Sequence, residues 1–140
     1  MIGVDLVYIP GFEEQLNMPG SQFAQAVFTP AELLVARRRG AVGGALARHL
    51  AGRWTAKEAF IKAWSQTLFG SQPPIARDQL DWREIEVQPD AYGRVSISLH
   101  GAVSRHFHDQ EWQLGPSLSI SHDGDYAIAV VRLDLSLIHI

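Results

Sequence analysis

A helical pattern of about 20 residues without proline, Ala45–Trp64, is the feature that most constrains this chain. On a helical wheel its large apolar side chains spread over one broad arc, which other elements have to cover. The chain has 140 residues. Two domains would leave about 70 residues each, the size at which a single hydrophobic core becomes marginal. We therefore expect one domain, residues 1–135, built around this helix.

Strand patterns lie on both sides of the helix in the sequence. Met1–Ile9 (MIGVDLVYI) is apolar and β-branched, and Pro10-Gly11 is expected to end it. The strands predicted after the helix are Ile85–Val87, Val95–Leu99, Trp112–Ser121 and Tyr126–Asp134. Helices first and antiparallel strands last predict an α+β fold, in which an antiparallel sheet packs against the long central helix.

The other segments are short helices and loops. Thr29 precedes Pro30 and stands three residues before Glu32, which is a capped helix start, and this helix would end in the basic run Arg37–Arg39. We also expect a loosely helical stretch over 12–26, a long loop over 65–80 and a short helix over 101–107. The last residues, 136–140 (SLIHI), are out of keeping with a finished strand, and we set them aside as a candidate vector-derived tail.

The composition excludes several classes of protein. With no cysteine, the chain is not a disulfide scaffold and has neither a cysteine nucleophile nor a thiolate metal site. The net charge of −3 argues against general nucleic-acid binding, which needs a basic footprint. No apolar run approaches the ~18 residues of a membrane span. We expect a soluble, cytoplasmic protein that binds neither nucleic acid nor membrane.

The long helix carries its polar residues in two groups. A polar arc opposite the apolar side consists of Arg48, Thr55, Glu58 and Lys62. A ladder with a spacing of four residues, interleaved with the apolar side, consists of His49, Arg53 and Lys57. An ordinary surface helix separates polar from apolar residues. Basic residues within a face that should be buried are therefore unusual.

The carboxylates of Asp5 and Glu58 have two interpretations each. Glu58 and Lys62 make a surface ion pair worth about 0.3–0.5 kcal/mol, and Asp5 faces water from an edge strand. Alternatively, Asp5 is buried, where it needs a partner, and joins Glu58 in an oxygen-ligand site of the kind that suits Mg²⁺ and phosphate oxygens. The basic residues that would then match a polyanionic ligand are Arg48, Arg53, Lys57 and Lys62.

A strand with alternating polar residues ends at His122. Its polar face consists of Ser117, Ser119 and Ser121. Hydroxyls and an imidazole at a strand end can bind phosphate or orient a nucleophile, and the alternative is a solvated edge strand with a turn histidine. A triad of Ser121, His122 and Asp123 is excluded, because adjacent strand residues point to opposite faces and the G-x-S-x-G motif is missing.

Three segments resemble the signature stretches of the 4′-phosphopantetheinyl transferases: GVDLVYI (3–9), LAGRWTAKEAFIKAW (50–64) and LSISHDGDYAIAVV (118–131). FTPAEL and IEVQPDAYGRVSISL also match in order and spacing, so the resemblance covers about residues 2–132. The compact length is similar to the holo-acyl-carrier-protein synthase type, and the longer 65–80 loop resembles actinobacterial members. The resemblance implies transfer of phosphopantetheine from coenzyme A to a serine of an apo-acyl-carrier protein, with release of 3′,5′-ADP, in fatty acid biosynthesis.

The resemblance also implies roles for individual residues. Asp5 and Glu58 would hold Mg²⁺ on the coenzyme A pyrophosphate, and Lys62 would lie near the transferring phosphate. Glu58, directly or through a metal-bound water, would be the base for the carrier serine. The residues implied to bind the nucleotide phosphates are Arg53 and His122, with Arg48 and Lys57 as weaker candidates.

Short members of this family are homotrimers, so the resemblance implies a homotrimer with sites between subunits. Asp5 and the Glu58 helix would come largely from one chain and the histidine segment from its neighbour. Their docking segment after the first strand is basic, whereas residues 5–32 contain no Lys or Arg. Docking would then rely on Phe12, Leu16, Met18 and Phe23, or on Arg37–Arg39. This argues against a free, strongly acidic carrier protein as the preferred partner. The objection does not apply to a carrier domain tethered in a fatty acid synthase, so both kinds of partner stay open.

Two other functions fit part of the pattern. A coenzyme A-binding module without transfer activity would keep the basic residues but lose a carboxylate, and a structural subunit of a synthase complex would need no metal. Both Asp5 and Glu58 are present, which favours the transferase.

Overall fold

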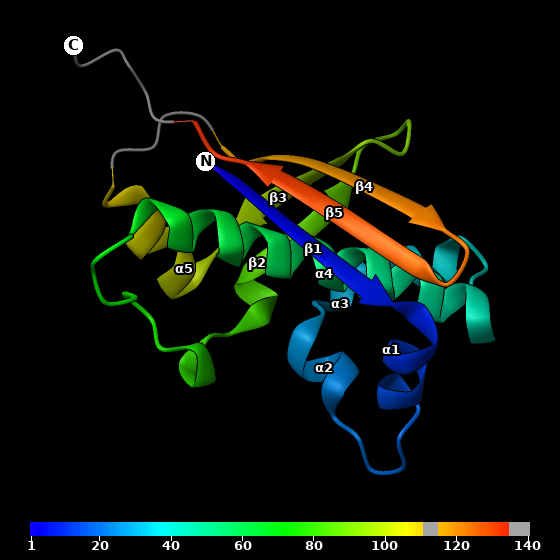
Figure 1. Cartoon of the computed structure of the whole chain (residues 1–140). Helices are drawn as coiled ribbons and strands as arrows, with labels where there is room; N and C mark the ends of the chain where they lie inside the picture. The colour runs from blue at the N-terminus through cyan, green and yellow to red at the C-terminus, as the bar shows by residue number, and fades with distance from the viewer. Residues whose placement is uncertain (111–114, 135–140) are drawn as a thin grey trace.

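The computed structural model describes residues 1–110 and 115–134, and in it a long helix lies against one face of a three-stranded sheet (Figure 1). The strands of this sheet are, in spatial order, Ile2–Tyr8 (β1), Tyr126–Arg132 (β5) and Ser117–Asp123 (β4). A two-stranded sheet consists of Ile85–Pro89 (β2) and Val95–Leu99 (β3). Both sheets are antiparallel. The predicted α+β fold is confirmed, while Trp112 and the 136–140 tail lie outside the described residues.

The long helix, α4, spans Gly43–Thr67 and is longer at both ends than the sequence pattern predicts. The short helices are Ile9–Leu16 (α1), Phe23–Val27 (α2), Pro30–Arg38 (α3) and Gly101–His108 (α5). Two 3-10 turns follow α4, at Arg77–Gln79 (η1) and Trp82–Glu84 (η2). The predicted capping box of α3 is present. Pro10-Gly11 follows the end of β1, as predicted, and lies in the first turn of α1, which tolerates the missing N–H of proline.

The first strand and the long helix approach each other closely at Gly3. A Cβ built on Gly3 would overlap the carbonyl oxygen of Ala59 and the amide nitrogen of Ala63 in α4. Because side chains alternate along a strand, Asp5 shares this face of β1 and is brought next to the same helix. The contact between small residues therefore positions the carboxylate that the sequence singles out.

The hydrophobic core has two parts. The larger part lies between α4, the three-stranded sheet and α5, and it includes Phe60, Trp64 and Phe107. The second part lies where α1, α2 and α3 pack against α4 (Figure 1). Within the described ranges, no helix is both long enough and apolar enough to cross a bilayer.

Three of the apolar residues expected to dock a carrier belong to the second part of the core. Phe12 is buried, and Leu16 and Phe23 are partly buried against the same cluster. The Phe12 and Phe23 ring centroids are 5.7 Å apart, and Phe23 also packs edge-on against Trp54. The burial of Phe12 contradicts its expected docking role, whereas docking through the partly buried Leu16 and Phe23 stays a prediction. Met18, in contrast, is 59% exposed.

Candidate active site

Asp5 points from β1 toward α4 and contacts two side chains there. Thr55 donates a hydrogen bond through Oγ1 to Asp5 Oδ2 at 2.6 Å, and Lys62 donates through Nζ to Asp5 Oδ1 at 2.9 Å. The Asp5 side chain is 14% exposed. Although β1 is an edge strand, the interpretation of Asp5 as a carboxylate in open water is wrong. It is a largely covered carboxylate held by a hydroxyl and an ammonium group.

Glu58 lies on the same face of α4 as Thr55 and Lys62, three residues after the first and four before the second. Its ion pair is with Arg77 of η1, whose Nη2 lies 2.7 Å from Glu58 Oε1, and not with Lys62. The ion pair between Glu58 and Lys62 that the sequence allowed is therefore not formed, because each side chain has another partner. Arg77 was missed in the sequence, because no local pattern marks which arginine of a loop folds back onto a helix. We call Asp5, Thr55, Glu58 and Lys62 the carboxylate cluster.

His122 lies against the N-terminal half of α4. Its Nε2 is 3.1 Å from the carbonyl oxygen of Arg48, which can only accept, so Nε2 carries the hydrogen. Arg48 Nη1 donates to the carbonyl oxygen of Gly124 at 2.9 Å and ties the β4–β5 turn to the helix. On the opposite face of β4 lie Ser117, Ser119 and Ser121. The serine hydroxyls and the imidazole therefore do not form one site.

Arg53 and His49 lie on the next flank of α4 with unused hydrogen-bonding atoms. Arg53 is 7% exposed, and among the described residues neither its Nη2 nor His49 Nε2 has a hydrogen-bond partner. Burial, together with the charges of Arg53 and Arg39, lowers the pKa of His49 to about 4. Burial also lowers the pKa of His122. An orphaned guanidinium N–H among cations fits an anion such as phosphate, and we call Arg48, His49, Arg53 and His122 the basic cluster.

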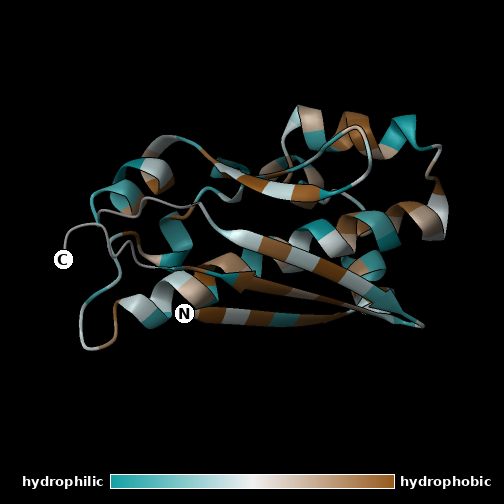
Figure 2. Cartoon of the chain, turned by 90° about the horizontal axis from the view of Figure 1, so that it is seen from above, coloured by the Kyte–Doolittle hydropathy of each residue, from teal (hydrophilic) through white to brown (hydrophobic). Residues whose placement is uncertain are grey.

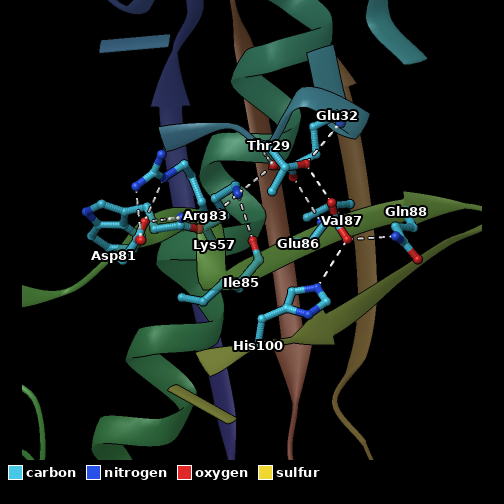
Figure 3. A network of polar contacts seen from close by, with 11 residues as sticks. Thr29, Glu32, Lys57, Asp81, Arg83, Ile85, Glu86, Val87, Gln88 and His100 are labelled. Carbon is cyan, nitrogen blue, oxygen red and sulfur yellow. Dashed lines mark hydrogen bonds and ion pairs between the residues drawn. The ribbon is translucent and has the colours of Figure 1, made fainter. Parts of the chain in front are cut away.

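Lys57 does not belong to this basic cluster. Its side chain is fully buried, and Nζ donates to Glu32 Oε1 at 2.9 Å, to the Trp82 carbonyl at 3.0 Å and to the Ile85 carbonyl at 2.7 Å (Figure 3). An ammonium group has three hydrogens to donate, and here all are used. The expectation that Lys57 helps to bind nucleotide phosphates is therefore wrong. Burial lowers the pKa of Lys57, while Glu32 opposes this effect.

The carboxylate cluster fits a hard divalent cation. Asp5 and Glu58 offer oxygen donors, the ligands that Mg²⁺ prefers. Over residues 1–110 and 115–134, no group of three or more His, Cys, Asp or Glu side chains could hold a metal. Mg²⁺ is commonly bound through one or two carboxylates, with substrate phosphates and water completing its shell. Two carboxylates beside cationic side chains match that arrangement.

Comparisons with known proteins place the chain in one family. The model of the 4′-phosphopantetheinyl transferase superfamily matches residues 1–131. A holo-[acyl-carrier-protein] synthase of Corynebacterium glutamicum is 49% identical, over 96% of this chain and 97% of the relative. That of Mycobacterium ulcerans is 43% identical, over 96% of each chain. The resemblance to actinobacterial members is thereby confirmed.

Solved structures lead to the same family. The structure of a Chronobacterium ammoniagenes ACPS–CoA complex superposes with a TM-score of 0.85 at 50% identity, over 96% of this chain and 97% of that one. Sequence and backbone therefore match over nearly the whole chain, including all three signature segments. The chain belongs to the 4′-phosphopantetheinyl transferase superfamily.

Proposed function

We propose that this chain, through a catalytic domain over residues 1–135, transfers the 4′-phosphopantetheine group of coenzyme A to a serine of an apo-acyl-carrier protein and releases 3′,5′-ADP. The observation that carries the proposal is the carboxylate cluster, in which Asp5 and Glu58 flank one face of α4 with Lys62 beside them. The names of the relatives and the coenzyme A complex of the C. ammoniagenes protein support this activity.

The carboxylate cluster has the groups that phosphoryl transfer needs. Asp5 and Glu58 would hold Mg²⁺, which supplies neutralisation of the pyrophosphate charge when bound. Lys62 is half exposed and is held beside the two carboxylates by its ion pair with Asp5. Its ammonium group would therefore stabilise charge on the transferring phosphate. The Glu58 carboxylate would accept the serine proton as the serine oxygen attacks the phosphorus next to pantetheine. The bond from that phosphorus to the nucleotide breaks, and 3′,5′-ADP leaves with the electron pair.

The basic cluster is suited to the nucleotide phosphates. Arg53 would donate its unpaired Nη2 to a phosphate oxygen. His122 already uses Nε2 on the Arg48 carbonyl, so it would face the phosphate with Nδ1, which donates only when the ring is protonated. Burial lowers the pKa of His122, and the negative charge of a bound phosphate would raise it again and favour that protonated form. Arg48 holds the turn at Gly124, and we assign it the role of positioning His122.

The direction of Arg53 supports a site shared between subunits. Arg53 and Glu58 are five residues apart on α4, which places their side chains about 140° apart around the helix axis. One chain therefore directs Arg53 away from its own carboxylate cluster. A neighbouring subunit that brings its basic cluster to this carboxylate cluster would complete the site.

The outer face of the three-stranded sheet supports a homotrimer with such shared sites. In Figure 2 the strand that begins at the N-terminus is largely brown, the colour of hydrophobic residues. The exposed apolar residues of the outer face are Ile2, Val4, Leu6, Tyr8, Tyr126, Ile128 and Val130. A contiguous apolar surface of this kind marks a protein interface. We call it the outer apolar face.

The remaining parts of the proposal concern the partner and the location. Arg37, Arg38 and Arg39 are exposed at the end of α3, and they would meet the acidic surface of a carrier. The reaction would serve fatty acid biosynthesis in the cytoplasm. A carrier domain tethered in a synthase needs less docking affinity than a free carrier protein, because tethering raises its effective concentration.

The test is to incubate the protein with coenzyme A, Mg²⁺ and an apo-carrier and to weigh the carrier by mass spectrometry. A free carrier protein and a synthase-embedded domain form the two arms. We expect a gain of one phosphopantetheine, which chelation of Mg²⁺ and Glu58→Gln both abolish. Coenzyme A binding without mass gain in either arm would contradict the transferase and leave a binding module.

A further inference from the structure

Arg77 contacts the carboxylate cluster from a segment outside the three signature stretches. It belongs to η1, and its guanidinium lies over the Trp82 ring, 5.2 Å from the centroid. Its Nη2 donates to Glu58 Oε1 at 2.7 Å. The Arg77 side chain is 65% exposed, whereas that of Glu58 is 12% exposed. A loop residue at the surface is thus attached to a carboxylate proposed to hold the metal.

The segment that carries Arg77 also forms one wall of a cavity of about 210 Å³, which we call the loop wall, and α4 forms the opposite wall. The apolar residues of this cavity include Ile61, Trp64, Leu68, Pro73, Ile75 and Leu80. Arg77 lines the cavity as well, so it lies between the apolar cavity and the carboxylate cluster. The contact between Arg77 and Glu58 therefore connects the loop wall to the polar face of α4.

Each of the two carboxylates of the cluster is paired with one exposed cationic side chain. Lys62 engages Asp5, and Arg77 engages Glu58, each through one carboxylate oxygen. An ion pair with a well-exposed partner contributes little in water. A divalent cation has twice the charge of a guanidinium and bonds carboxylate oxygens directly. The divalent cation and the Arg77 guanidinium also repel each other. Placing both close to the Glu58 carboxylate therefore costs free energy.

We propose that Arg77 and a divalent cation compete for the Glu58 carboxylate. Arg77 is then a positioning residue, which orients Glu58 and gives it up when the metal binds. Release of Arg77 removes the ion pair that joins η1 to α4, so metal binding loosens the loop wall of the cavity. The inference rests on the proposed role of Glu58 as a metal ligand.

The test uses Mn²⁺ alone as the probe and the full chain, with free Mn²⁺ measured by electron paramagnetic resonance. Arg77→Gln removes the competing guanidinium. Arg83→Gln is the matched control, since Arg83 is an exposed arginine next to Trp82 that pairs with Asp81 at 3.0 Å. We expect Arg77→Gln to bind Mn²⁺ about three- to tenfold more tightly than the wild type. Arg83→Gln should bind it as the wild type does.

Hydrogen exchange supplies a second measurement that does not depend on activity. Mn²⁺ should speed amide exchange over residues 71–80 in the wild type, and Arg77→Gln should exchange rapidly there without metal. Equal Mn²⁺ affinities of wild type and Arg77→Gln, or no measurable binding by either, would overturn the competition. Glu58→Gln separates the two proposals: if it binds Mn²⁺ like the wild type, the metal site itself is assigned wrongly.

Discussion

Gly52 of α4 and His122 of β4 lie so close that a Cβ on Gly52 would come within 2.7 Å of His122 Nε2. The same Cβ would be 3.2 Å from Ile120 Cγ2, on the side of β4 that faces the helix. The missing side chain lets the imidazole rest on the helix and reach the Arg48 carbonyl. Two signature stretches far apart in the sequence thus form one structural unit.

Gly52→Ala should therefore displace His122 and weaken coenzyme A binding. The added methyl group pushes the imidazole away, and the hydrogen bond to Arg48 is lost. We expect KM for coenzyme A to rise about three- to tenfold, the cost of about one hydrogen bond, with a smaller change in KM for the carrier. Gly44→Ala is the control, since a Cβ there makes only an ordinary 3.7 Å contact. An unchanged KM for coenzyme A in Gly52→Ala would remove His122 from the nucleotide site.

Lys57→Met should destabilise the fold without touching the site. Glu32, whose side chain is 1% exposed, would lose its ammonium partner. Loss of one member of a buried pair costs about 3–5 kcal/mol, measured as the free energy of unfolding in urea. Lys62→Met is the comparison, because Lys62 is half exposed and its loss should cost less than about 1 kcal/mol. Similar stabilities of the two variants would contradict a structural role for Lys57.

The order of the elements and the candidate residues Asp5, Glu58 and Lys62 could be predicted from the sequence, because local patterns mark each of them. That Asp5 meets Lys62 of α4, 57 residues away, is a tertiary contact that no local pattern predicts. Asp5 interrupts an apolar strand, and Glu58 and Lys62 repeat at helical spacing. The capping box at Thr29 and Glu32 is equally local. Such features depend on residues a few positions apart, so one sequence suffices to recognise them.

Lys57 and Arg77 could not be assigned, because their partners are distant in the sequence. The helical ladder places Lys57 with Arg53, but α3 and β2 decide that it is enclosed by Glu32 and backbone carbonyls. Arg77 lies in a loop whose path back to Glu58 follows from packing around the apolar cavity. Tertiary contacts, not local propensity, determine both roles.

His49 should make stability depend on pH. Its pKa falls from about 6.5 in the unfolded chain to about 4 in the folded protein, so between these values the unfolded state binds a proton that the folded state does not. Stability is then complete above pH ~6.5 and declines as the pH falls toward 4, by about 1–3 kcal/mol after allowance for partial exposure. His49→Gln should flatten this dependence in urea unfolding, and His108→Gln, at an exposed histidine, should retain it. An equal slope in His49→Gln would contradict the assignment.

Leu6→Glu should dissociate the proposed homotrimer. Leu6 is 60% exposed and lies opposite Ile128 on the outer apolar face, so a carboxylate there would be desolvated on assembly. We expect monomers by light scattering, a native circular dichroism spectrum and loss of transfer activity. Met18→Glu introduces the same charge at a residue that is 59% exposed after α1, and it should stay trimeric. A trimeric Leu6→Glu protein would place the interface elsewhere.

Mixed trimers should test whether the site is shared between subunits. Glu58→Gln alone lacks the proposed base, and Arg53→Ala alone lacks a phosphate ligand, so each homotrimer should be inactive or nearly so. In a hybrid, an Arg53→Ala chain supplies an intact Glu58 and its Glu58→Gln neighbour an intact Arg53. Random assortment after joint refolding would restore about a quarter of the sites, measured as carrier mass gain. The double variant Arg53→Ala/Glu58→Gln has neither an intact Arg53 nor an intact Glu58. Mixing it with either single variant should therefore restore no transfer activity. If the hybrids remain inactive while trimeric, both groups act within one chain.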